Sequence, residues 1–291
     1  MKKIKKILFP TDFSETANHA LGQALLLPDS QDAEVIVQHV VDDYFGPHTH
    51  WASLFDVHIL QKELDAHIEN EMMKVIPQSA TGIKLRPVIS KGKPDVEIVK
   101  LADKENPDLI VMGPAKSVVT NRVIGHAKHA VFAVPQKASP TTASGIRSIL
   151  VTTDFSEGSK RVLEYAFDLK DLIGGEVYLL HAIETSTAMY FGIKQGTFLD
   201  GRKETIAKME EWAKNSLLNA TPQRYVKDPS VHHLVRVGKV ADVISAAIKD
   251  FNVDIVIVGT REHGATRQHL IGSTADKILR NIDAPLLTVR K

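Results

Sequence analysis

Hydrophobic and polar positions follow a repeated order along the chain, in which a short apolar run precedes a longer segment with apolar residues at helical spacing. Between the runs, apolar positions recur three and four residues apart, as in amphipathic helices. Strands that alternate with helices predict a parallel sheet joined by right-handed crossovers. In the first half the apolar runs predict strands at 4–9, 35–41, 83–89 and 109–112.

The second half has the same alternation. A helix predicted over 203–218 is expected to turn its apolar side chains toward the core, namely Ile206, Met209, Trp212, Ala213 and Leu217. The apolar runs predict strands at 149–153, 177–183, 231–237, 253–258 and 286–289.

The two halves are copies of one unit. The segment KKILFPTDFSE begins at Lys5, and RSILVTTDFSE begins at Arg147. Asp12 and Asp154 lie 142 positions apart, and His39 and His181 have the same separation. This period is too long for a solenoid repeat and suits a whole domain. We therefore expect domains over 1–137 and 146–291, joined by a linker over 138–145 that is rich in Ser, Thr, Pro and Gly.

The stretch from Val258 to Thr274 has the features of a phosphate-binding loop. A buried strand ends at Gly259, and Gly272-Ser273-Thr274 opens the next helix. Helix-start N–H groups attract anions, and glycines let the backbone approach a ligand. The alternative is an ordinary strand–loop–helix connection in which Ser273 is a plain N-cap.

The first half departs from this pattern after Gly113. No Ser or Thr follows Gly125, and only 9 positions separate Gly125 from Val134, against 17 from Gly272 to Val289. We expect the last helix of the first half to be mostly missing, and its phosphate loop to be degenerate.

Composition removes several classes of function. The formal net charge of +1 gives no basic field for nucleic acid, and no apolar stretch is long enough to cross a membrane. The start of the chain lacks a signal-peptide apolar region, so a cytoplasmic protein is predicted. Without cysteine there is no disulfide, thiolate zinc site or Cys nucleophile. His48 and His50 have no carboxylate partner in register, so no metal site is predicted.

Four segments resemble the universal stress protein family: ILVTTDFSE, LLHA, VDIVIVGT, and the GS that opens the last helix before APLLTVRK. The resemblance covers nearly the whole chain as two tandem copies. It implies an α/β fold of two doubly wound, parallel, five-stranded sheets with strand order 3-2-1-4-5. Some members of the family bind adenine nucleotides through a sequence motif. The motif consists of Gly, two residues, Gly, nine residues, Gly and then Ser or Thr.

That strand order implies where a ligand would bind. Strands one and four are neighbours whose crossovers leave on opposite faces, and open α/β sheets bind ligands at such carboxyl ends. By resemblance, Asp154 contacts adenine or ribose and the Ala182 backbone contacts adenine. The ligand implied is ATP or ADP, alone or with Mg²⁺. By the same resemblance, Val258 and Gly259 line the ribose and first phosphate. The phosphates are held by Gly272, Ser273 and Thr274. The alternative for Asp154 is a turn or helix-capping aspartate.

One position departs from the binding motif. Glu262 stands where the second glycine is expected, although nine residues still separate it from Gly272. A carboxylate about 5 Å from a phosphate charge costs roughly 3 kcal/mol at an effective dielectric near 20. This cost would weaken binding on the order of a hundredfold. Nearby Arg261, Arg267 or a magnesium ion could offset it.

The sequence leaves two classes of function open. The first is a cytoplasmic stress-response regulatory protein that binds an adenine nucleotide in its C-terminal half. The alternative is a scaffold or partner-interaction protein of the same fold that binds no nucleotide. An enzyme is not expected, because no paired carboxylates, metal cluster or activated nucleophile gather near the loop. A homodimer or another protein partner is compatible with both classes.

Overall fold

The computed structural model divides the chain into two compact units, Lys2–Pro140 and Thr141–Lys291, with Met1 assigned to the second. Most of the predicted linker, 138–145, lies outside the described residues, so its limits stay a prediction. No helix in the part of the chain that the structure describes is long and apolar enough to span a membrane. The structure describes residues 4–27, 30–41, 57–75, 83–136, 145–184, 200–260, 278–279 and 281–290.

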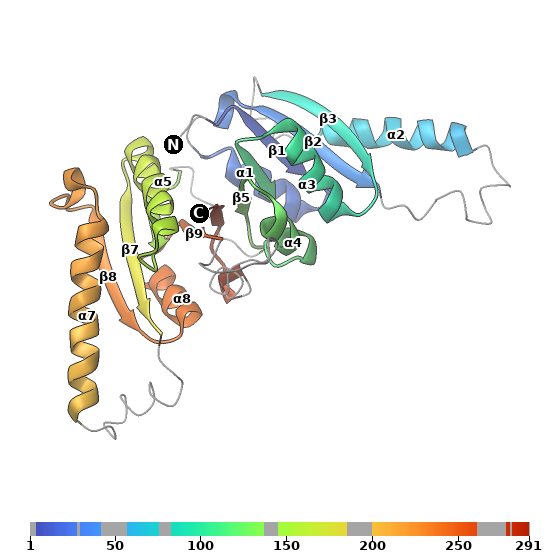
Figure 1. The fold of residues 1–291 in the computed structure, drawn as a ribbon. Helices are drawn as coiled ribbons and strands as arrows, with labels where there is room; N and C mark the ends of the chain where they lie inside the picture. The colour runs from blue at the N-terminus through green and yellow to red at the C-terminus, as the bar shows by residue number, and fades with distance from the viewer. Residues whose placement is uncertain are drawn as a thin grey trace. The chain divides into compact units, whose positions relative to one another are not determined.

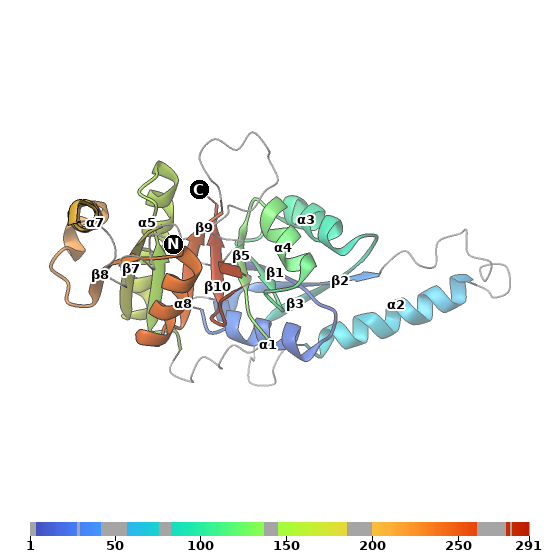
Figure 2. The same ribbon diagram turned by 90° about the horizontal axis from the view of Figure 1, so that it is seen from below.

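The first unit is a parallel sheet with the order β3-β2-β1-β4-β5. Helices α1 and α2 lie on one face of this sheet, and α3 and α4 lie on the other (Figure 2). The order is 3-2-1-4-5, as the family resemblance implies. The elements in chain order (Figure 1) are β1 (Lys6–Pro10), α1 (Glu15–Ala24), β2 (Glu34–Val41), α2 (Val57–Met73), β3 (Lys84–Lys91), α3 (Pro94–Glu105), β4 (Leu109–Met112), α4 (Val118–His126) and β5 (Ala130–Ala133).

The second unit repeats this topology, because its parallel strands have the order β8-β7-β6-β9-β10. Helices α5 and α7 lie on one face and α8 on the other (Figure 2). The predicted doubly wound fold is therefore confirmed in both halves. The elements are β6 (Ser148–Thr152), α5 (Glu157–Ile173), β7 (Glu176–Ile183), α7 (Asp200–Ala220), β8 (Val231–Val237), α8 (Val240–Asp250), β9 (Ile255–Gly259) and β10 (Leu286–Val289).

The core of each unit is centred on its first strand. Strands with helices on both faces are apolar along their length, because neither face meets water. The corresponding residues 7–9 and 149–151 lie 142 positions apart and have no exposed surface, namely Ile7, Leu8, Phe9, Ile149, Leu150 and Val151.

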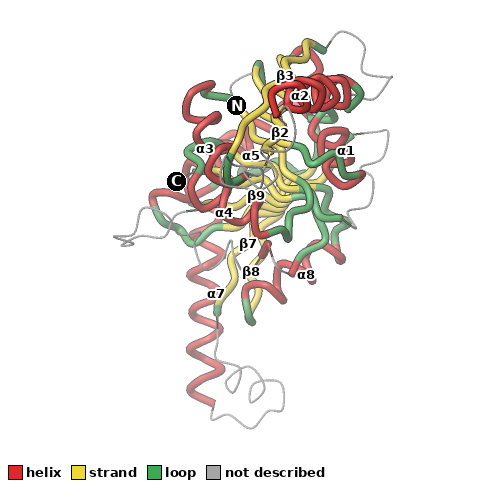
Figure 3. Tube along the Cα trace, turned by 90° about the vertical axis from the view of Figure 1, so that its right-hand side faces the viewer, coloured by secondary structure: helices red, strands yellow, loops and turns green. Residues whose placement is uncertain are grey.

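Helix α7 corrects one prediction about the core. Ile206, Ala213 and Leu217 are buried as predicted, but Met209 is 47% exposed and Trp212 is 58% exposed. At about 100° per residue, the three buried residues fall within about 40° of one another, whereas Trp212 lies about 120° from Ile206. The helix also extends past the strands of its own unit (Figures 1 and 3), so part of its apolar surface meets no sheet.

Helix α4 corrects a second prediction. The last helix of the first half is present. It is α4, which begins before Gly125 and includes this glycine in its final turn. Its N-cap is Ser117, whose Oγ accepts a hydrogen bond of 3.0 Å from the N–H of Thr120. The expectation aligned Gly125 with Gly272, and thereby overlooked a Ser/Thr start signal eight residues upstream.

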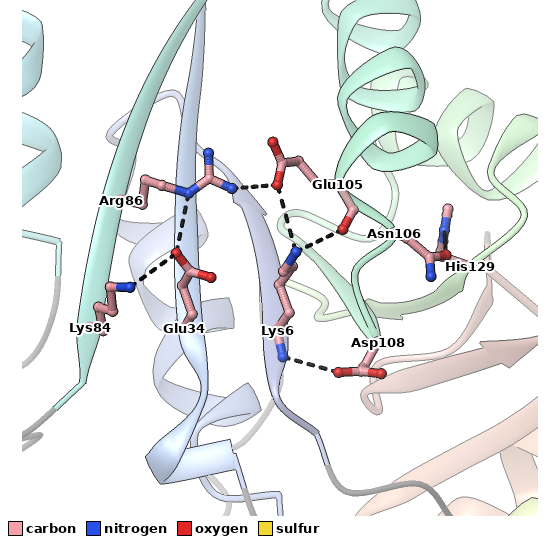
Figure 4. A network of polar contacts seen from close by, with 8 residues as sticks. All are labelled: Lys6, Glu34, Lys84, Arg86, Glu105, Asn106, Asp108 and His129. Atoms are coloured by element: carbon pink, nitrogen blue, oxygen red, sulfur yellow. Dashed lines mark hydrogen bonds and ion pairs between the residues drawn. The ribbon is translucent and has the colours of Figure 1, made fainter.

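At the amino ends of its strands, the first unit has a network of ion pairs (Figure 4). Arg86 on β3 binds Glu34 on β2 at 3.2 Å and also pairs with Glu105 at the end of α3. The Lys6 ammonium donates to the Glu105 carbonyl at 2.9 Å. These contacts join three strands and a helix of the first unit at the amino ends of its strands, away from the carboxyl-end turn that contains Asp12, so we assign the network a structural role.

Candidate functional site

The turn that follows the first strand has the same construction in both units. In the second unit, the Thr153 hydroxyl accepts a hydrogen bond of 3.0 Å from the N–H of Phe155. The Asp154 carboxylate accepts one of 3.0 Å from the N–H of Ser156. The first unit makes the corresponding bonds at 2.9 and 3.0 Å, through Thr11 and Asp12. The repeated TDFSE sequence thus encodes a defined turn, in which each short polar side chain satisfies a backbone N–H group.

The phenylalanine of this turn has an unusual backbone conformation. Phe13 has φ 62° and Phe155 has φ 59°, in the left-handed region that bulky side chains rarely adopt. Each ring packs on a histidine of the second strand, with centroids 4.6 Å apart for Phe13 and His39, and 4.4 Å for Phe155 and His181. The ring contact and the turn hydrogen bonds together hold a conformation that costs on the order of 1–3 kcal/mol.

The two histidines also hold the strand that precedes the turn. Nδ1 of His181 lies 2.9 Å from the carbonyl oxygen of Thr153, and Nδ1 of His39 lies 2.8 Å from that of Thr11. A carbonyl oxygen only accepts, so Nδ1 carries a proton in both histidines. Their recurrence 142 positions apart indicated a duplication, but their contact with the turn could not be inferred from spacing.

The carboxylate of Asp154 has more hydrogen-bond donors than that of Asp12. The Ser156 hydroxyl donates to Asp154 Oδ1 at 2.6 Å, and the Ser159 hydroxyl donates to the same oxygen. Ala17 occupies the position in the first unit that corresponds to Ser159. The serines fix the orientation of Asp154, which is a turn residue beside the N-cap Ser156, one of the roles that the alternative interpretation allows.

The described candidate residues lie at the carboxyl ends of three neighbouring strands. Strand β6 pairs with β7 and with β9, so Asp154 follows the strand that lies between the other two. Ala182 is near the end of β7, and Gly259 is the last residue of β9, directly after the buried Val258. The structure therefore brings Asp154, Ala182 and Gly259 to one edge of the sheet, at the switch point where β6 and β9 are neighbours.

Thr260 adds a polar group that the sequence interpretation did not select. The residue follows Gly259 and is 4% exposed, and its hydroxyl has no hydrogen-bond partner among the described residues. A buried hydroxyl without a partner carries a free-energy cost that a ligand or a water can relieve. The sequence signal was available, since Thr260 is the first polar residue after an apolar strand.

Four candidate residues lie outside the described part of the chain: Glu262, Gly272, Ser273 and Thr274. Their assignment to phosphate binding stays a prediction. His48 and His50 also lie outside it. Within the described residues, no three or more His, Asp or Glu side chains gather in a way that could hold a metal ion.

Gly113 occupies the position in the first unit that corresponds to Gly259. A Cβ atom there would come within 2.7 Å of the Thr16 carbonyl oxygen and 2.9 Å of the Ala20 side chain. Helix α1 thus packs too closely on this point for any other residue. Packing alone accounts for a glycine at Gly113, so a glycine at this place in the fold is not by itself evidence of a ligand.

Comparison with known proteins agrees with this architecture. The model of the universal stress protein family matches residues 3–135 and again 145–290. A universal stress protein of Methanocaldococcus jannaschii is 33% identical over 158 residues, which cover 46% of this chain and 97% of that protein. A crystal structure of a universal stress protein from Archaeoglobus fulgidus covers 98% of this chain and 96% of its own, with a TM-score of 0.65 at 21% identity. Another solved universal stress protein is in complex with cAMP, and matches half of this chain with a TM-score of 0.33 at 15% identity.

The fold defines a doubly wound α/β protein, and the candidate site lies at the carboxyl ends of the first and fourth strands of the second unit. The chain belongs to the universal stress protein family, and contains two tandem copies of its domain.

Proposed function

We propose that this protein is a stress-response regulator that binds one adenine nucleotide, ATP or ADP, in its C-terminal half. The observation that carries this proposal is the position of Asp154, Ala182 and Gly259 at neighbouring strand ends. Open α/β sheets bind their ligands at this point of the topology.

Each residue would have a role suited to its chemistry. An ionised carboxylate only accepts hydrogen bonds, so Asp154 would accept from ribose hydroxyls or from the adenine amino group. The backbone of Ala182 would pair with the edge of adenine. Val258 and Gly259 would line the ribose and first phosphate, with no side chain at Gly259 to block the backbone. Gly272, Ser273 and Thr274 would bind the phosphates, with or without Mg²⁺, through N–H groups at a helix start.

We propose a regulatory rather than a catalytic role. The serine hydroxyls that donate to Asp154 hold its carboxylate in one orientation as a fixed acceptor, which suits binding better than proton transfer. The family to which the chain belongs is generally regulatory. Action in the cytoplasm, and association with a second copy or another protein, belong to the same proposal.

The first test is native mass spectrometry of the protein as purified and after addition of Mg-ATP. We expect one adenine nucleotide per chain. Asp154→Asn should weaken binding by about 10- to 100-fold, the loss expected when a hydrogen bond to a charged group becomes a neutral one. Asp12→Asn changes the corresponding turn of the first unit and should leave the affinity unchanged. A protein that takes up no nucleotide at millimolar Mg-ATP would instead favour the scaffold function.

Glu262 provides a second test of the same site. Glu262→Gly restores the glycine of the family motif and should raise nucleotide affinity by tenfold or more, up to about a hundredfold, because it removes a negative charge near the phosphates. Glu262→Gln removes the charge but keeps the side chain, and so separates repulsion from steric exclusion. Titration calorimetry with ATP and with adenosine measures the effect. An equal gain for uncharged adenosine would contradict the electrostatic explanation.

A further inference from the structure

A cavity of about 460 Å³ opens between the first turns of α5 and the last turns of α7. This volume is within the range of about 300–1,000 Å³ that small-molecule sites occupy. Its wall contains four nearly buried side chains: Thr153 is 6% exposed, Ser159 2%, Leu163 4% and Thr221 5%. No strand end except that of β6 reaches its lining, so the cavity is distinct from the edge where Ala182 and Gly259 lie.

Several polar groups that face the cavity are available to a ligand. Among the residues that the structure describes, the side chains of Glu164, Ser216 and Asn219 have no hydrogen-bond or ion-pair partner. Thr221 differs, because its hydroxyl donates to the Leu217 carbonyl at 2.8 Å and lies 2.7 Å from Nε2 of His233. The cavity thus combines a fixed hydroxyl in its wall with unpaired polar groups closer to solvent.

The charges at the cavity alternate in sign along α5. Lys160 and Glu164 both line it, and residues four apart lie on the same face of a helix, separated by about 6 Å along its axis. The Lys160 ammonium lies 2.7 Å from a Glu157 carboxylate oxygen, in a pair that is exposed on both sides and therefore weak. The cation lies nearer the N-terminus of α5, whose dipole also favours a negative group. A ligand with adjacent carboxylate and ammonium groups fits this polarity.

The duplication shows which of these groups are needed for the fold. Four lining residues recur 142 positions earlier with the same identity: Thr153, Phe155, Ser156 and Leu163, which correspond to Thr11, Phe13, Ser14 and Leu21. The polar groups of α5 do not recur, because Ser159, Lys160 and Glu164 correspond to Ala17, Asn18 and Gly22. The first unit has the same topology without these groups, so they are not required to form it.

We propose that the cavity between α5 and α7 binds a small zwitterion of the amino-acid class, with its carboxylate at Lys160 and its ammonium at Glu164. The hydroxyl and amide groups of Ser216 and Asn219 would bind a polar ligand side chain. This site goes beyond the proposed nucleotide site and does not depend on it.

The test uses the full-length protein free of nucleotide. Saturation-transfer NMR with the twenty standard L-amino acids should identify one or more that bind, and titration calorimetry then gives the affinity. Lys160→Asn introduces the residue of the first unit, and should weaken binding at least tenfold. Glu164→Gln should also weaken amino-acid binding to a similar extent. Glycerol at the same concentration as the amino acid should not compete with it for the cavity.

The matched control is Asn18→Lys, which changes the corresponding position of the first unit and should leave amino-acid binding unchanged. Both altered α5 residues are exposed, so neither substitution should unfold the protein. The proposal is overturned if no amino acid shows saturation transfer, if binding survives Lys160→Asn and Glu164→Gln together, or if glycerol competes equally. Because no nucleotide is present, failure of this test leaves the nucleotide proposal untouched.

Discussion

Asp254 and Asp108 show how a single side chain joins two strands of each sheet. Oδ2 of Asp254 accepts hydrogen bonds of 2.8 and 2.9 Å from the N–H groups of Arg147 and Ser148. Oδ2 of Asp108 accepts bonds of 2.9 and 3.0 Å from the N–H groups of Lys5 and Lys6. Each aspartate precedes the fourth strand of its unit and satisfies the backbone at the start of the first strand, where no ladder partner is available.

Asp254→Ala should therefore destabilise the second unit by about 1–3 kcal/mol, because it leaves two backbone donors without their charged acceptor. Asp108→Ala should have a comparable effect on the first unit. Urea unfolding followed by circular dichroism measures both. Asp254→Asn keeps one acceptor oxygen and should lose less, so an equal loss in the Asn and Ala variants would contradict the explanation.

Asp228 makes the stability of the second unit depend on pH in the acid range. The Ser230 hydroxyl, followed by the Lys170 ammonium at 2.9 Å, lowers the pKa of Asp228 from its ordinary value of 3.8 to about 2. A pKa that is lower in the folded state contributes stability that is complete above the unfolded value and is lost as the pH falls toward the folded value. This contribution to stability is lost between about pH 4 and pH 2.

Urea midpoints measured between pH 5 and pH 2 should therefore fall less steeply for Asp228→Asn than for the unaltered protein. The unaltered protein should be the more stable of the two above pH 4, where its carboxylate is ionised. Parallel curves for the two proteins would show that Asp228 is not responsible for the acid dependence.

Residue identity and order placed part of the candidate site at strand ends, but did not predict its contacts. Asp154, Ala182 and Gly259 could be placed at strand ends, because parallel strands bring their carboxyl ends to one edge. The buried hydroxyl of Thr260 and the Ser159–Asp154 hydrogen bond could not be predicted, since they depend on side-chain orientation in three dimensions. The exposure of Trp212 was mispredicted for a similar reason: an apolar residue on a helix flank is buried only where a neighbouring element covers it.

At the scale of elements, α4 is the most informative difference between expectation and structure. The strands and the other helices followed from apolar spacing, whereas the last helix of the first half, expected to be mostly missing, is the nine-residue α4, which ends just after Gly125. The expectation compared Gly125 with Gly272, where the sequence of the second half predicts a helix start, yet a local signal, Ser117 with Thr120 three residues later, defines the start of α4. Local capping chemistry overrides a register inferred from the other copy.

Ser117→Ala tests this assignment. Loss of the N-cap should cost about 0.5–2 kcal/mol, and Ser117→Gly should cost only a few tenths. Hydrogen exchange of the α4 amides should increase in the Ala variant. If exchange of α4 is unchanged while that of another helix rises, Ser117 is not its N-cap.

At the scale of the whole molecule, the sequence predicted the duplication from landmarks that recur at a fixed separation. Four segments carried the resemblance to the family, and that resemblance implied the strand order of both units. Each feature of one unit can be compared with the corresponding position in the other unit of the same chain. Predicted binding of one nucleotide per chain, rather than two, follows from the different loops after Gly113 and Gly259. Comparison of single substitutions at corresponding positions therefore separates residues needed for folding from residues needed for binding.

The TDFSE turn has a consequence for how related genes are annotated. Both copies keep its hydrogen bonds, its left-handed phenylalanine and its histidine contact, although the loops and helix surfaces around them have diverged. The turn satisfies its own backbone N–H groups and packs its own ring, so its contacts serve the fold whether or not a ligand binds beside it. Its presence in a related sequence therefore indicates the fold, and inferences about ligand binding should be drawn from the positions around it.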